Sequence, residues 1–387
     1  MLEKYIAYWA GQHPDKTAII FEAENKKLTW AQLYCRLQAS DQGDIILKGL
    51  CESPLVLFTT GTTGKSKGVV ISPQAIEADA ENLVDAHGYT SDITFIVTGS
   101  LDHLGSLSKL WPMLMVGGTI HIIPGIKDPN IFFKAIADAE GKVATFLVPA
   151  NIRFLLSLCR KELEQCARVI DFIETGAAAM AQKDMEELCK VLPHSRLYNT
   201  YASTETGIIS TYDFNNNPCV AGCLGKPMKN SSFFITTEGT VACSGKTLMT
   251  GYLDDEELTR EVLRDGVVYT HDLGFIDNDG CLHLTGRADD IINVGGFKVN
   301  PQEVEDAAML SPIVKECVCV ADTHPVIGTI AHLIVVTKDG EPLDKRHLAA
   351  FLDSKLERYK VPQNFSQAES LHRTFNGKID RKAYRNK

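Results

Sequence analysis

The segment Thr59–Gly68 has a composition suited to binding a polyphosphate. It reads Thr-Thr-Gly-Thr-Thr-Gly-Lys-Ser-Lys-Gly and directly follows an apolar run at Pro54–Phe58. Glycines let the backbone come close to a ligand, while hydroxyl, ammonium and backbone N–H groups donate hydrogen bonds to phosphate oxygens. A hydroxyl-rich loop directly after a buried-type strand is poorly explained as an ordinary surface loop, so we predict a phosphate-binding loop here.

The end of this loop, Gly64-Lys65-Ser66, superficially matches the end of a Walker A motif. That motif requires a glycine five residues before Gly64, and position 59 is threonine. The sequence therefore excludes a P-loop NTPase and indicates a nucleotide site of another kind.

Two further segments carry residue types that could contact a nucleotide. In the segment 201–205, Tyr-Ala-Ser-Thr-Glu, an aromatic ring can stack on adenine and Thr204 can contact phosphate. Glu205 can hold Mg²⁺ between ATP oxygens. The small residues of the segment 175–179, Thr-Gly-Ala-Ala-Ala, suit a flat base that lies against the backbone. The same small residues also suit a tight turn after a buried strand, and the two explanations are compatible.

A carboxylate and an arginine farther along the chain could bind hydroxyl or phosphate groups of a ligand. Asp272 ends the segment Tyr-Thr-His-Asp, and its carboxylate can accept hydrogen bonds from both ribose hydroxyls. Arg287 lies in the segment Gly-Arg-Ala-Asp-Asp-Ile-Ile and can contact ribose or phosphate.

These motifs occur in one order over nearly the whole chain, and together they resemble the adenylate-forming (AMP-binding) superfamily. This superfamily includes acyl- and aryl-CoA synthetases, adenylation domains of peptide synthetases and luciferases. The resemblance implies an α/β fold with a large layered N-terminal domain at 1–286, which includes a β-rich lobe. It also implies a small, mobile α+β domain at 287–387. The implied reaction converts a carboxylic acid and ATP into an acyl-adenylate and pyrophosphate, and then passes the acyl group to a thiol.

The resemblance also assigns roles to single residues. Asp289 corresponds to the hinge between two domain orientations. Lys378, in Asn-Gly-Lys-Ile-Asp-Arg, corresponds to the lysine that bridges the acid's carboxylate and the α-phosphate, where an ammonium group neutralises developing charge. The loop Gly295–Phe297 corresponds to the segment that forms the thiol tunnel, and Lys298 to a basic residue near phosphate. The implied nucleotide contacts are Thr60, Gly61, Thr62, Thr63, Gly64, Lys67, Gly176, Ala177, Ala178, Asn199, Tyr201, Thr204, Asp272, Arg287, Gly295, Gly296 and Lys298, and Glu205 is the implied catalytic Mg²⁺ ligand.

Three positions depart from the usual motifs. Ser66 stands where the family usually has proline, and Ala202 and His271 each stand where it usually has glycine. His271 is expected to be either an exposed turn residue or a contact of the nucleotide.

The segment expected to face the acid can be aligned with the family in two ways. The segment Ser100–Gly105 resembles the one that faces the acid, where CoA ligases often carry histidine and amino-acid-activating relatives carry aspartate. The first alignment makes His103 a catalytic-site residue and the second selects Asp102. Val148, Pro149 and Asn151 are further candidates for lining the pocket.

The elements that must position these residues alternate between strand and helix up to about residue 210, which is typical of a layered α/β domain. Short β-type runs separated by Gly and Asp turns follow over residues 219–286 and predict the β-rich lobe. The expected strands are 18–21, 54–58, 93–97, 119–123, 143–148, 170–173, 196–198, 233–236, 240–243, 267–270, 281–284, 314–320 and 330–337, and the expected helices are 3–12, 29–38, 73–86, 301–309 and 345–357.

Composition places limits on partners and location. With 44% hydrophobic and 23% charged residues the chain is globular, and its net charge of −10 argues against nucleic acid or an anionic membrane surface as a partner. The longest uncharged run, Leu110–Ile126, contains Pro and Gly and falls short of a spanning helix. The start of the chain lacks a signal-peptide pattern, and the 11 scattered cysteines fit reduced thiols, so a cytoplasmic protein is expected.

The expected enzyme is an AMP-forming acid–thiol ligase that uses ATP, Mg²⁺ and coenzyme A. One candidate acid is an o-succinylbenzoate-type aryl acid. The alternatives are an amino- or aryl-acid adenylating enzyme that loads the phosphopantetheine thiol of a carrier protein in trans, and a non-catalytic nucleotide- or acyl-binding relative. The region before the phosphate loop is shorter than is usual for the family, so a homodimer that covers exposed apolar surface is a further expectation.

Overall fold

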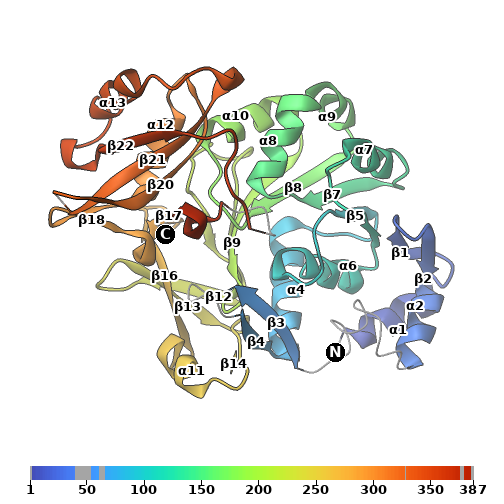
Figure 1. The fold of residues 1–387 in the computed structure, drawn as a ribbon. Coiled ribbons are helices and arrows are strands. Elements are labelled where there is room, and N and C mark those ends of the chain that lie inside the picture. Colours follow the sequence, from blue (N-terminus) through green and yellow to red (C-terminus); the bar gives the residue numbers. More distant parts are fainter. Residues whose placement is uncertain (1, 40–53, 61–65, 327, 375–378, 385–387) are drawn as a thin grey trace. The chain divides into compact units, whose positions relative to one another are not determined.

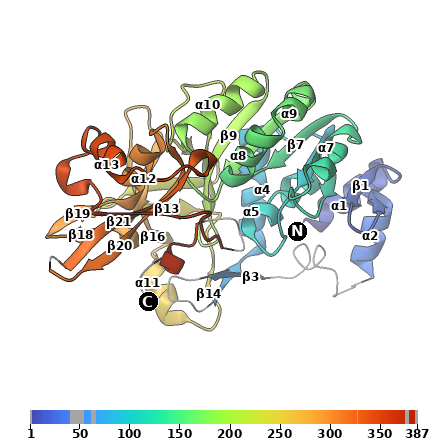
Figure 2. The same cartoon turned by 45° about the horizontal axis from the view of Figure 1, so that its top comes forward.

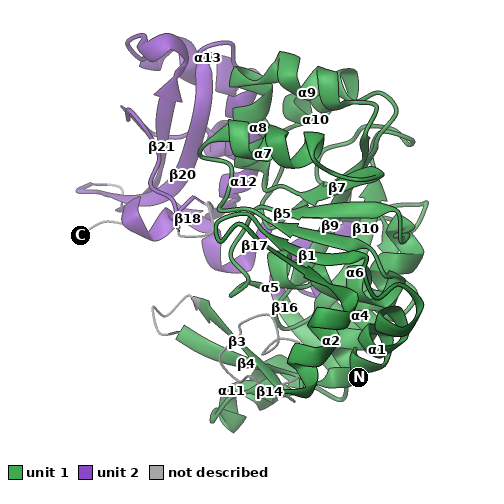
Figure 3. Cartoon of the chain, turned by 90° about the vertical axis from the view of Figure 1, so that its right-hand side faces the viewer, with its two compact units in different colours: residues 1–234, 242–270, 276–283 green, residues 235–241, 271–275, 284–387 purple. Residues whose placement is uncertain are grey.

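The structure, a computed structural model, describes residues 2–39, 54–60, 66–326, 328–374 and 379–384, except for the side chain of Thr60. By its contacts the chain divides into two compact units (Figure 3). Unit 1 comprises Met1–Phe234, Ala242–Thr270 and Ile276–His283, and unit 2 comprises Ile235–Val241, His271–Phe275 and Leu284–Lys387. Among the described residues, no helix is long and apolar enough to cross a membrane.

A nine-stranded sheet forms the centre of unit 1 (Figure 1). Strands β6, β5, β7, β8 and β9 run parallel to one another, and β1 joins them in parallel beside β6. In sheet order the strands are β11 (Lys226–Pro227), β10 (Gly207–Asp213), β9 (Arg196–Ser203), β8 (Ile170–Gly176), β7 (Lys142–Phe146), β5 (Ile93–Val97), β6 (Thr119–Ile122), β1 (Thr17–Phe21) and β2 (Lys26–Thr29).

Helices cover both faces of this sheet, which explains why its central strands are apolar throughout. All five residues of β5 are buried. Phe95 and Phe172 pack into one hydrophobic cluster, and their neighbours Ile96 and Ile173 pack into another, because successive side chains of a strand point to opposite faces.

The helices that cover this sheet divide between the two clusters, and Figure 2 shows a second view of the ribbon. The first cluster contains buried residues of α1 (Glu3–Gln12), α2 (Trp30–Gln38), α4 (Pro73–His87), α5 (Leu104–Leu107) and α6 (Leu110–Val116). The second contains those of α7 (Pro129–Ala137), α8 (Pro149–Leu158), α9 (Arg160–Cys166) and α10 (Gln182–Val191).

Local signals set the ends of α4, the helix that follows the phosphate loop. The hydroxyl of Ser72 accepts a hydrogen bond from the Ala75 N–H, and Pro73 occupies the first turn, where its missing N–H costs nothing. Gly88 ends the helix in the left-handed conformation, with φ of 61°.

Smaller sheets complete the chain. A three-stranded sheet of unit 1 has the order β14 (Gly251–Tyr252), β4 (Ser66–Ile71) and β3 (Leu55–Thr60). The β-rich lobe contains β12 (Ser231–Ile235), β13 (Thr240–Gly245), β16 (Val267–Ile276), β15 (Leu263–Arg264) and β17 (Leu282–Arg287), with helix α11 (Glu256–Val262) before β15.

Unit 2 is built mainly on the long antiparallel pair β20 (Val314–His324) and β21 (Gly328–Thr337). Helices α12 (Pro301–Met309) and α13 (Lys345–Asp353) contribute Val304, Leu348 and Leu352 to its core. The remaining elements are the hairpin β18 (Ile292–Val294) and β19 (Phe297–Val299), the strand β22 (Asn364–Gln367), which is parallel to β21, and 3₁₀ turns at Ala288–Asp290, Lys338–Gly340, Arg358–Lys360 and Arg381–Tyr384.

The α/β class, the β-rich lobe and the smaller α+β part predicted from the sequence are confirmed. Several boundaries were wrong. The strand expected to reach residue 148 ends at Phe146, because Val148 is the N-cap of α8 and Pro149 begins that helix. The helix expected to reach residue 357 ends at Asp353, after which Leu356 turns back to pack against the core of unit 2. The domain boundary at 286 and the mobility of the second domain stay predictions.

Candidate active site

The two described ends of the predicted phosphate loop lie on paired strands. Strands β3 and β4 pair antiparallel, with Thr59 opposite Lys67 and Thr60 opposite Ser66. The Ser66 hydroxyl donates a hydrogen bond of 3.4 Å to the carbonyl of Thr59. Strand β4 was not predicted from the sequence, because it begins within the loop segment and has only a short apolar run of its own. The predicted phosphate contacts Gly61, Thr62, Thr63 and Gly64 lie outside the described residues, and Lys67 is the one that the structure places in full.

Four of the predicted motifs follow neighbouring parallel strands at the same end. Strands β5, β7, β8 and β9 pair in parallel, so their carboxyl ends lie along one edge of the sheet. The segments at this edge are Ser100–Gly105 after β5, Val148–Asn151 after β7, Gly176–Ala178 at the end of β8 and Tyr201–Glu205 at the end of β9. In open α/β sheets this carboxyl edge is where ligands bind. The fold therefore brings together segments that lie up to about a hundred residues apart.

The turn predicted to face adenine begins later than expected, because β8 continues through Gly176. A Cβ atom on Gly176 would lie 2.8 Å from the carbonyl oxygen of Thr200, so only glycine fits there. Ala177 takes φ of 67°, a conformation that side chains larger than glycine rarely adopt. Ala177 and Ala178 are exposed. The turn thus offers a surface of small side chains at the carboxyl edge.

The second nucleotide segment lies mostly in β9 and is partly occupied by internal contacts. The side-chain amide of Asn199 is buried and donates a hydrogen bond of 3.0 Å to the carbonyl of Cys223. Tyr201 is only 5% exposed. Thr204 is half-buried in the turn between β9 and β10. The adenine stack of Tyr201 and the nucleotide contact of Asn199 stay predictions.

Glu205 lies in the same turn, and the structure gives it two defined contacts. Its Oε1 accepts a hydrogen bond of 3.0 Å from the hydroxyl of Tyr252, and its carbonyl accepts one of 2.9 Å from the N–H of Met249. Among the described residues, no group of three or more His, Cys, Asp or Glu is arranged to hold a metal ion. Mg²⁺ usually takes one or two carboxylates and completes its shell with phosphates and water, so a single restrained carboxylate fits Mg²⁺ that arrives with ATP.

A buried ion pair joins the end of β8 to the start of α6, and the sequence reasoning missed it. Lys109 Nζ lies 2.7 Å from Glu174 Oε1, and the two side chains are 3% and 1% exposed. Glu174 directly precedes the adenine turn, and Lys109 precedes α6. His87 lies 3.7 Å from the other oxygen of Glu174, and burial lowers the pKa of this imidazole well below its usual range. The available signal in the sequence was that Lys109 and Glu174, which have opposite charges, each lie in an apolar segment.

The acid-facing segment separates its two candidates. Asp102 is exposed, and its Oδ2 accepts a hydrogen bond of 2.9 Å from the Ser100 hydroxyl, as in a surface turn. His103 is half-buried at the start of α5. A Cβ atom on Gly105 would contact the ring of Phe146 at 3.4 Å, so this helix passes close to the end of β7. Val148, Pro149 and Asn151 form the first turn of α8 after that strand.

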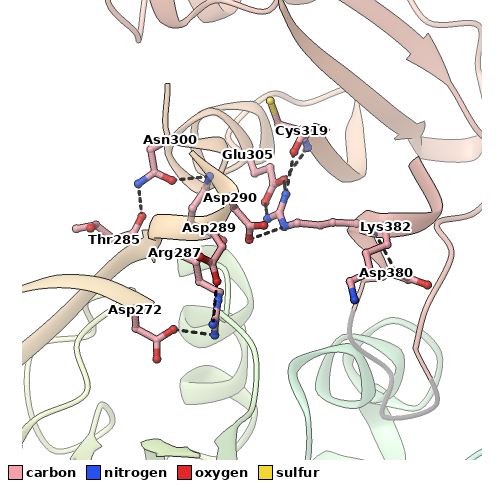
Figure 4. A network of polar contacts seen from close by, with 12 residues as sticks. Asp272, Thr285, Arg287, Asp289, Asp290, Asn300, Glu305, Cys319, Asp380 and Lys382 are labelled. Atoms are coloured by element: carbon pink, nitrogen blue, oxygen red, sulfur yellow. Dashed lines mark hydrogen bonds and ion pairs between the residues drawn. The ribbon is translucent and has the colours of Figure 1, made fainter. Parts of the chain in front are cut away.

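In unit 2 the predicted ribose residues form a chain of ion pairs (Figure 4). Arg287 lies 3.0 Å from Asp272 through one nitrogen and 3.9 Å from Asp289 through another. The other oxygen of Asp289 lies 2.8 Å from Nδ1 of His271. The side chain of His271 is 53% exposed, and its ring contacts the predicted hinge residue. The unusual residue therefore connects the ribose motif to the hinge motif.

The predicted thiol loop is a tight hairpin turn. Gly295 and Gly296 have φ of 57° and 89° between β18 and β19, a conformation that favours glycine at both positions. The ring of Phe297 stacks on Tyr359 with centroids 4.9 Å apart. Lys298 is exposed. Their roles toward phosphate or thiol stay predictions.

Lys378 lies outside the described residues, but the segment that follows it is firmly attached within unit 2 (Figure 4). The guanidinium of Arg381 donates to both carboxylate oxygens of Glu305 and, at 2.9 Å, to the carbonyl of Cys319. It also lies 3.6 Å from Asp290, beside the predicted hinge. Glu305 is only 6% exposed, so Arg381 pairs with a buried carboxylate.

Comparison with known sequences agrees with this geometry. The family model of AMP-binding enzymes matches residues 53–253, and the model of the AMP-binding enzyme C-terminal domain matches residues 303–378. The chain belongs to the AMP-binding enzyme family. Its relatives in this family include the indoleacetate–CoA ligase of Aromatoleum aromaticum, which is 29% identical over 94% of this chain and 73% of that protein. A 2-succinylbenzoate–CoA ligase of Bacillus cereus is 29% identical over 90% of this chain and 72% of that protein.

Solved structures of AMP-binding enzymes have the same fold. ATP-bound MatB from Rhodopseudomonas palustris superposes with a TM-score of 0.78 at 26% identity, covering 85% of this chain and 67% of that one. The o-succinylbenzoate CoA synthetase MenE of Bacillus subtilis, in complex with its acyl-adenylate, gives a TM-score of 0.83 over 98% and 97% of the two chains. At 19% identity this second likeness concerns the fold alone. The family and the enzyme class predicted from the sequence, an AMP-forming CoA ligase, are confirmed.

Proposed function

We propose that this AMP-binding enzyme joins an aromatic carboxylic acid to coenzyme A at the expense of ATP. The observation that carries the proposal is the meeting of the adenine turn, the Glu205 turn and the acid-facing segment at one carboxyl edge of a parallel sheet. The names of the relatives support the substrate class, because indoleacetate, ferulate and 2-succinylbenzoate are all aromatic acids.

In the first step a carboxylate oxygen of the acid attacks the α-phosphorus of ATP, and the bond to pyrophosphate breaks. The adenine turn at Ala177 and Ala178 receives the base, and Asp272 with Arg287 holds the ribose. Lys67 faces the polyphosphate, and Glu205 provides the carboxylate that holds Mg²⁺. Bound there, Mg²⁺ would neutralise charge on the phosphate oxygens. Lys378, assigned by its sequence motif, brings the two anions together.

In the second step the thiolate of coenzyme A attacks the acyl carbon, and AMP leaves. We propose that the small domain reorients about Asp289 between the two steps, so that Lys378 withdraws and the loop Gly295–Phe297 borders the thiol. Lys298 then offers its ammonium group to the phosphates of the incoming coenzyme A.

We assign the acid contact to His103 rather than Asp102. The half-buried position of His103 at the sheet edge suits an apolar aromatic acid, whereas Asp102 is exposed and held by Ser100. A carboxylate facing the substrate would instead suit an amino acid, which carries an ammonium group. The assignment to His103 therefore favours a CoA ligase over an enzyme that activates an amino acid and transfers it to a carrier protein.

The test is pyrophosphate release from ATP across panels of aryl, fatty and amino acids, with and without coenzyme A, beside Lys378→Ala. The expected result is release with aryl acids, faster turnover with coenzyme A and loss in the variant. Release that needs an amino acid and is not followed by a CoA thioester would favour a carrier-protein acceptor. ATP binding without release for any acid would favour the non-catalytic alternative.

We also propose a cytoplasmic location and a homodimer. The ten described cysteines are all free thiols, which suits a reducing compartment. Phe58 on β3 and Leu158 at the end of α8 are 58% and 71% exposed, and a second copy would cover such apolar side chains. Light scattering at micromolar concentrations tests the dimer, and a monomeric mass would rule it out.

A further inference from the structure

The short segment Met249–Leu253 connects the two parts of the predicted ATP·Mg²⁺ site within unit 1. Thr250 and Leu253 donate backbone hydrogen bonds, each of 2.8 Å, to the carbonyls of Val70 and Gly68 in β4. Met249 donates one of 2.9 Å to the carbonyl of Glu205. This one segment therefore forms hydrogen bonds both with the strand that follows the phosphate loop and with the turn that carries the predicted metal ligand.

Tyr252 lies in the middle of this segment, and its hydroxyl reaches Glu205. The hydroxyl donates a hydrogen bond of 3.0 Å to Glu205 Oε1. A carboxylate oxygen can only accept, so the phenol hydroxyl is the donor of this bond. A hydrogen bond to a carboxylate is stronger than one between neutral groups.

The ring of Tyr252 lies close to the ammonium group of Lys67 in the phosphate loop. Tyr252 pairs with Val69 in the antiparallel register of β14 and β4. Side chains two residues apart on a strand share a face, so Lys67 lies diagonally opposite Tyr252 on the same face. The Lys67 ammonium lies 5.7 Å from the ring centroid, within the range of a cation–π contact.

The backbone around Tyr252 leaves little freedom for this arrangement. The Tyr252 N–H donates a hydrogen bond of 2.8 Å to the hydroxyl of Thr259 on α11. A Cβ atom on Gly251 would lie 2.9 Å from that threonine, and one on Gly68 would lie 3.1 Å from Leu253. Close packing on both sides thus holds Tyr252 in one place between Glu205 and Lys67.

We propose that Tyr252 is a positioning residue for ATP·Mg²⁺ binding. Its hydroxyl restrains the Glu205 carboxylate through Oε1, and the carboxylate keeps further lone pairs for the metal. Its ring holds the Lys67 ammonium beside the polyphosphate. The inference rests on the proposed function, since it takes Glu205 as the Mg²⁺ ligand and Lys67 as a phosphate contact.

The decisive experiment measures binding rather than turnover. ATP affinity of the full chain is determined by calorimetry at a series of Mg²⁺ concentrations, and without Mg²⁺, for the wild type and Tyr252→Phe. Because Tyr252→Phe removes a hydrogen bond to a charged group, it should need a roughly tenfold higher Mg²⁺ concentration to reach half of the Mg²⁺-dependent gain in ATP affinity. Its ATP affinity without Mg²⁺ should change less than about twofold. A second variant, Tyr252→Leu, also removes the ring and should weaken Mg²⁺-free ATP binding about threefold through Lys67.

Two controls separate positioning from folding. Tyr212→Phe deletes another phenol hydroxyl of unit 1, which donates a 2.7 Å bond to the carbonyl of Pro218, and should leave the Mg²⁺ dependence unchanged. In the background of Glu205→Gln, Tyr252→Phe should have no further effect on Mg²⁺ dependence, because the carboxylate through which the hydroxyl acts is gone.

The proposal is overturned if Tyr252→Phe shows the wild-type Mg²⁺ dependence, or if it weakens ATP binding equally with and without Mg²⁺, which would indicate a packing role alone. Failure of the proposed function gives a different picture. In that case the wild-type chain itself either shows no Mg²⁺-dependent ATP binding or releases no pyrophosphate with any acid.

Discussion

The two groups of predicted nucleotide residues are held in different ways. In unit 1 the adenine turn and Glu205 are fixed by backbone pairing and by polar side chains beneath the sheet edge, such as Lys109 and Glu174, which are at most 3% exposed. In unit 2 the ribose residues are held by ion pairs at the surface, and Arg287 is 47% exposed. One group is supported by buried charges and the other by solvated ones.

This difference suggests separate tasks for the two groups. A buried ion pair is costly to break, so we expect the edge of the sheet to keep its shape when ATP binds. An exposed ion pair contributes little free energy and can exchange partners. We therefore expect that Arg287 can leave Asp289 or Asp272 for a ribose or phosphate at small cost, as the proposed change between two steps would require.

The largest effect is expected from Lys109→Met. The variant leaves Glu174 as an uncompensated charge in the interior, which should lower the free energy of unfolding by about 3–5 kcal/mol. Urea unfolding of the full chain measures it. The matched control is Arg260→Met, which removes an exposed pair with Glu256 and should cost less than about 1 kcal/mol. A loss below about 1 kcal/mol for Lys109→Met would show that the two regions do not differ.

Arg287→Ala should act on binding instead of folding. Loss of charge-assisted hydrogen bonds to the nucleotide predicts ATP affinity reduced by about 10- to 100-fold, with the free energy of unfolding changed by less than about 1 kcal/mol. Calorimetry with ATP and urea unfolding provide the two readouts. An unfolding loss like that of Lys109→Met, with ATP affinity intact, would contradict the assignment of Arg287 to the nucleotide.

Asp79→Asn probes the support of the Glu205 turn. The Asp79 carboxylate is fully buried and accepts a 2.8 Å hydrogen bond from the Ile208 N–H, which an asparagine oxygen can also accept. Burial raises the pKa of Asp79 well above its usual range. Because the pKa of Asp79 is higher in the folded than in the unfolded chain, the protonated carboxyl group contributes stability below the unfolded pKa of about 3.9. This contribution is lost as the pH rises through the folded pKa.

The variant should therefore become more stable than the wild type as the pH rises from about 4, with little difference below that value. Unfolding at a series of pH values measures this, and the lowest pH serves as the internal reference. A difference that stays constant with pH would mean that Asp79 is ionised in the folded protein without penalty.

The smallest effect is expected from His271→Gly, which restores the usual family residue. The bond between His271 and Asp289 is exposed, so the free energy of unfolding should change by less than about 1 kcal/mol and the thioester-forming rate by less than about fivefold. Urea unfolding and single-turnover CoA assays measure these. A loss near that of Lys109→Met would place the hinge motif among the rigid parts of the chain.

Much of the candidate site was predictable because it depends on residue types at close spacing. Glu205 beside Thr204, and the paired glycines at 295 and 296, can be recognised without a fold. The supporting contacts could not be, because their partners lie far apart in the chain. Lys109 is 65 residues from Glu174, and Tyr252 is 47 residues from Glu205. Nothing local in either segment indicates which distant residue it will meet.

The sequence by itself determined the chemistry of the motifs, their order and the ends of helices such as α4, because caps and turns depend on a few neighbouring residues. The tertiary structure decided which segments meet. Parallel pairing of β5, β7, β8 and β9 places their carboxyl ends on one edge, and the register of β14 with β4 sets Tyr252 against Lys67. Strand pairing and register arise from packing across the whole sheet, and that is why only the folded chain specifies them.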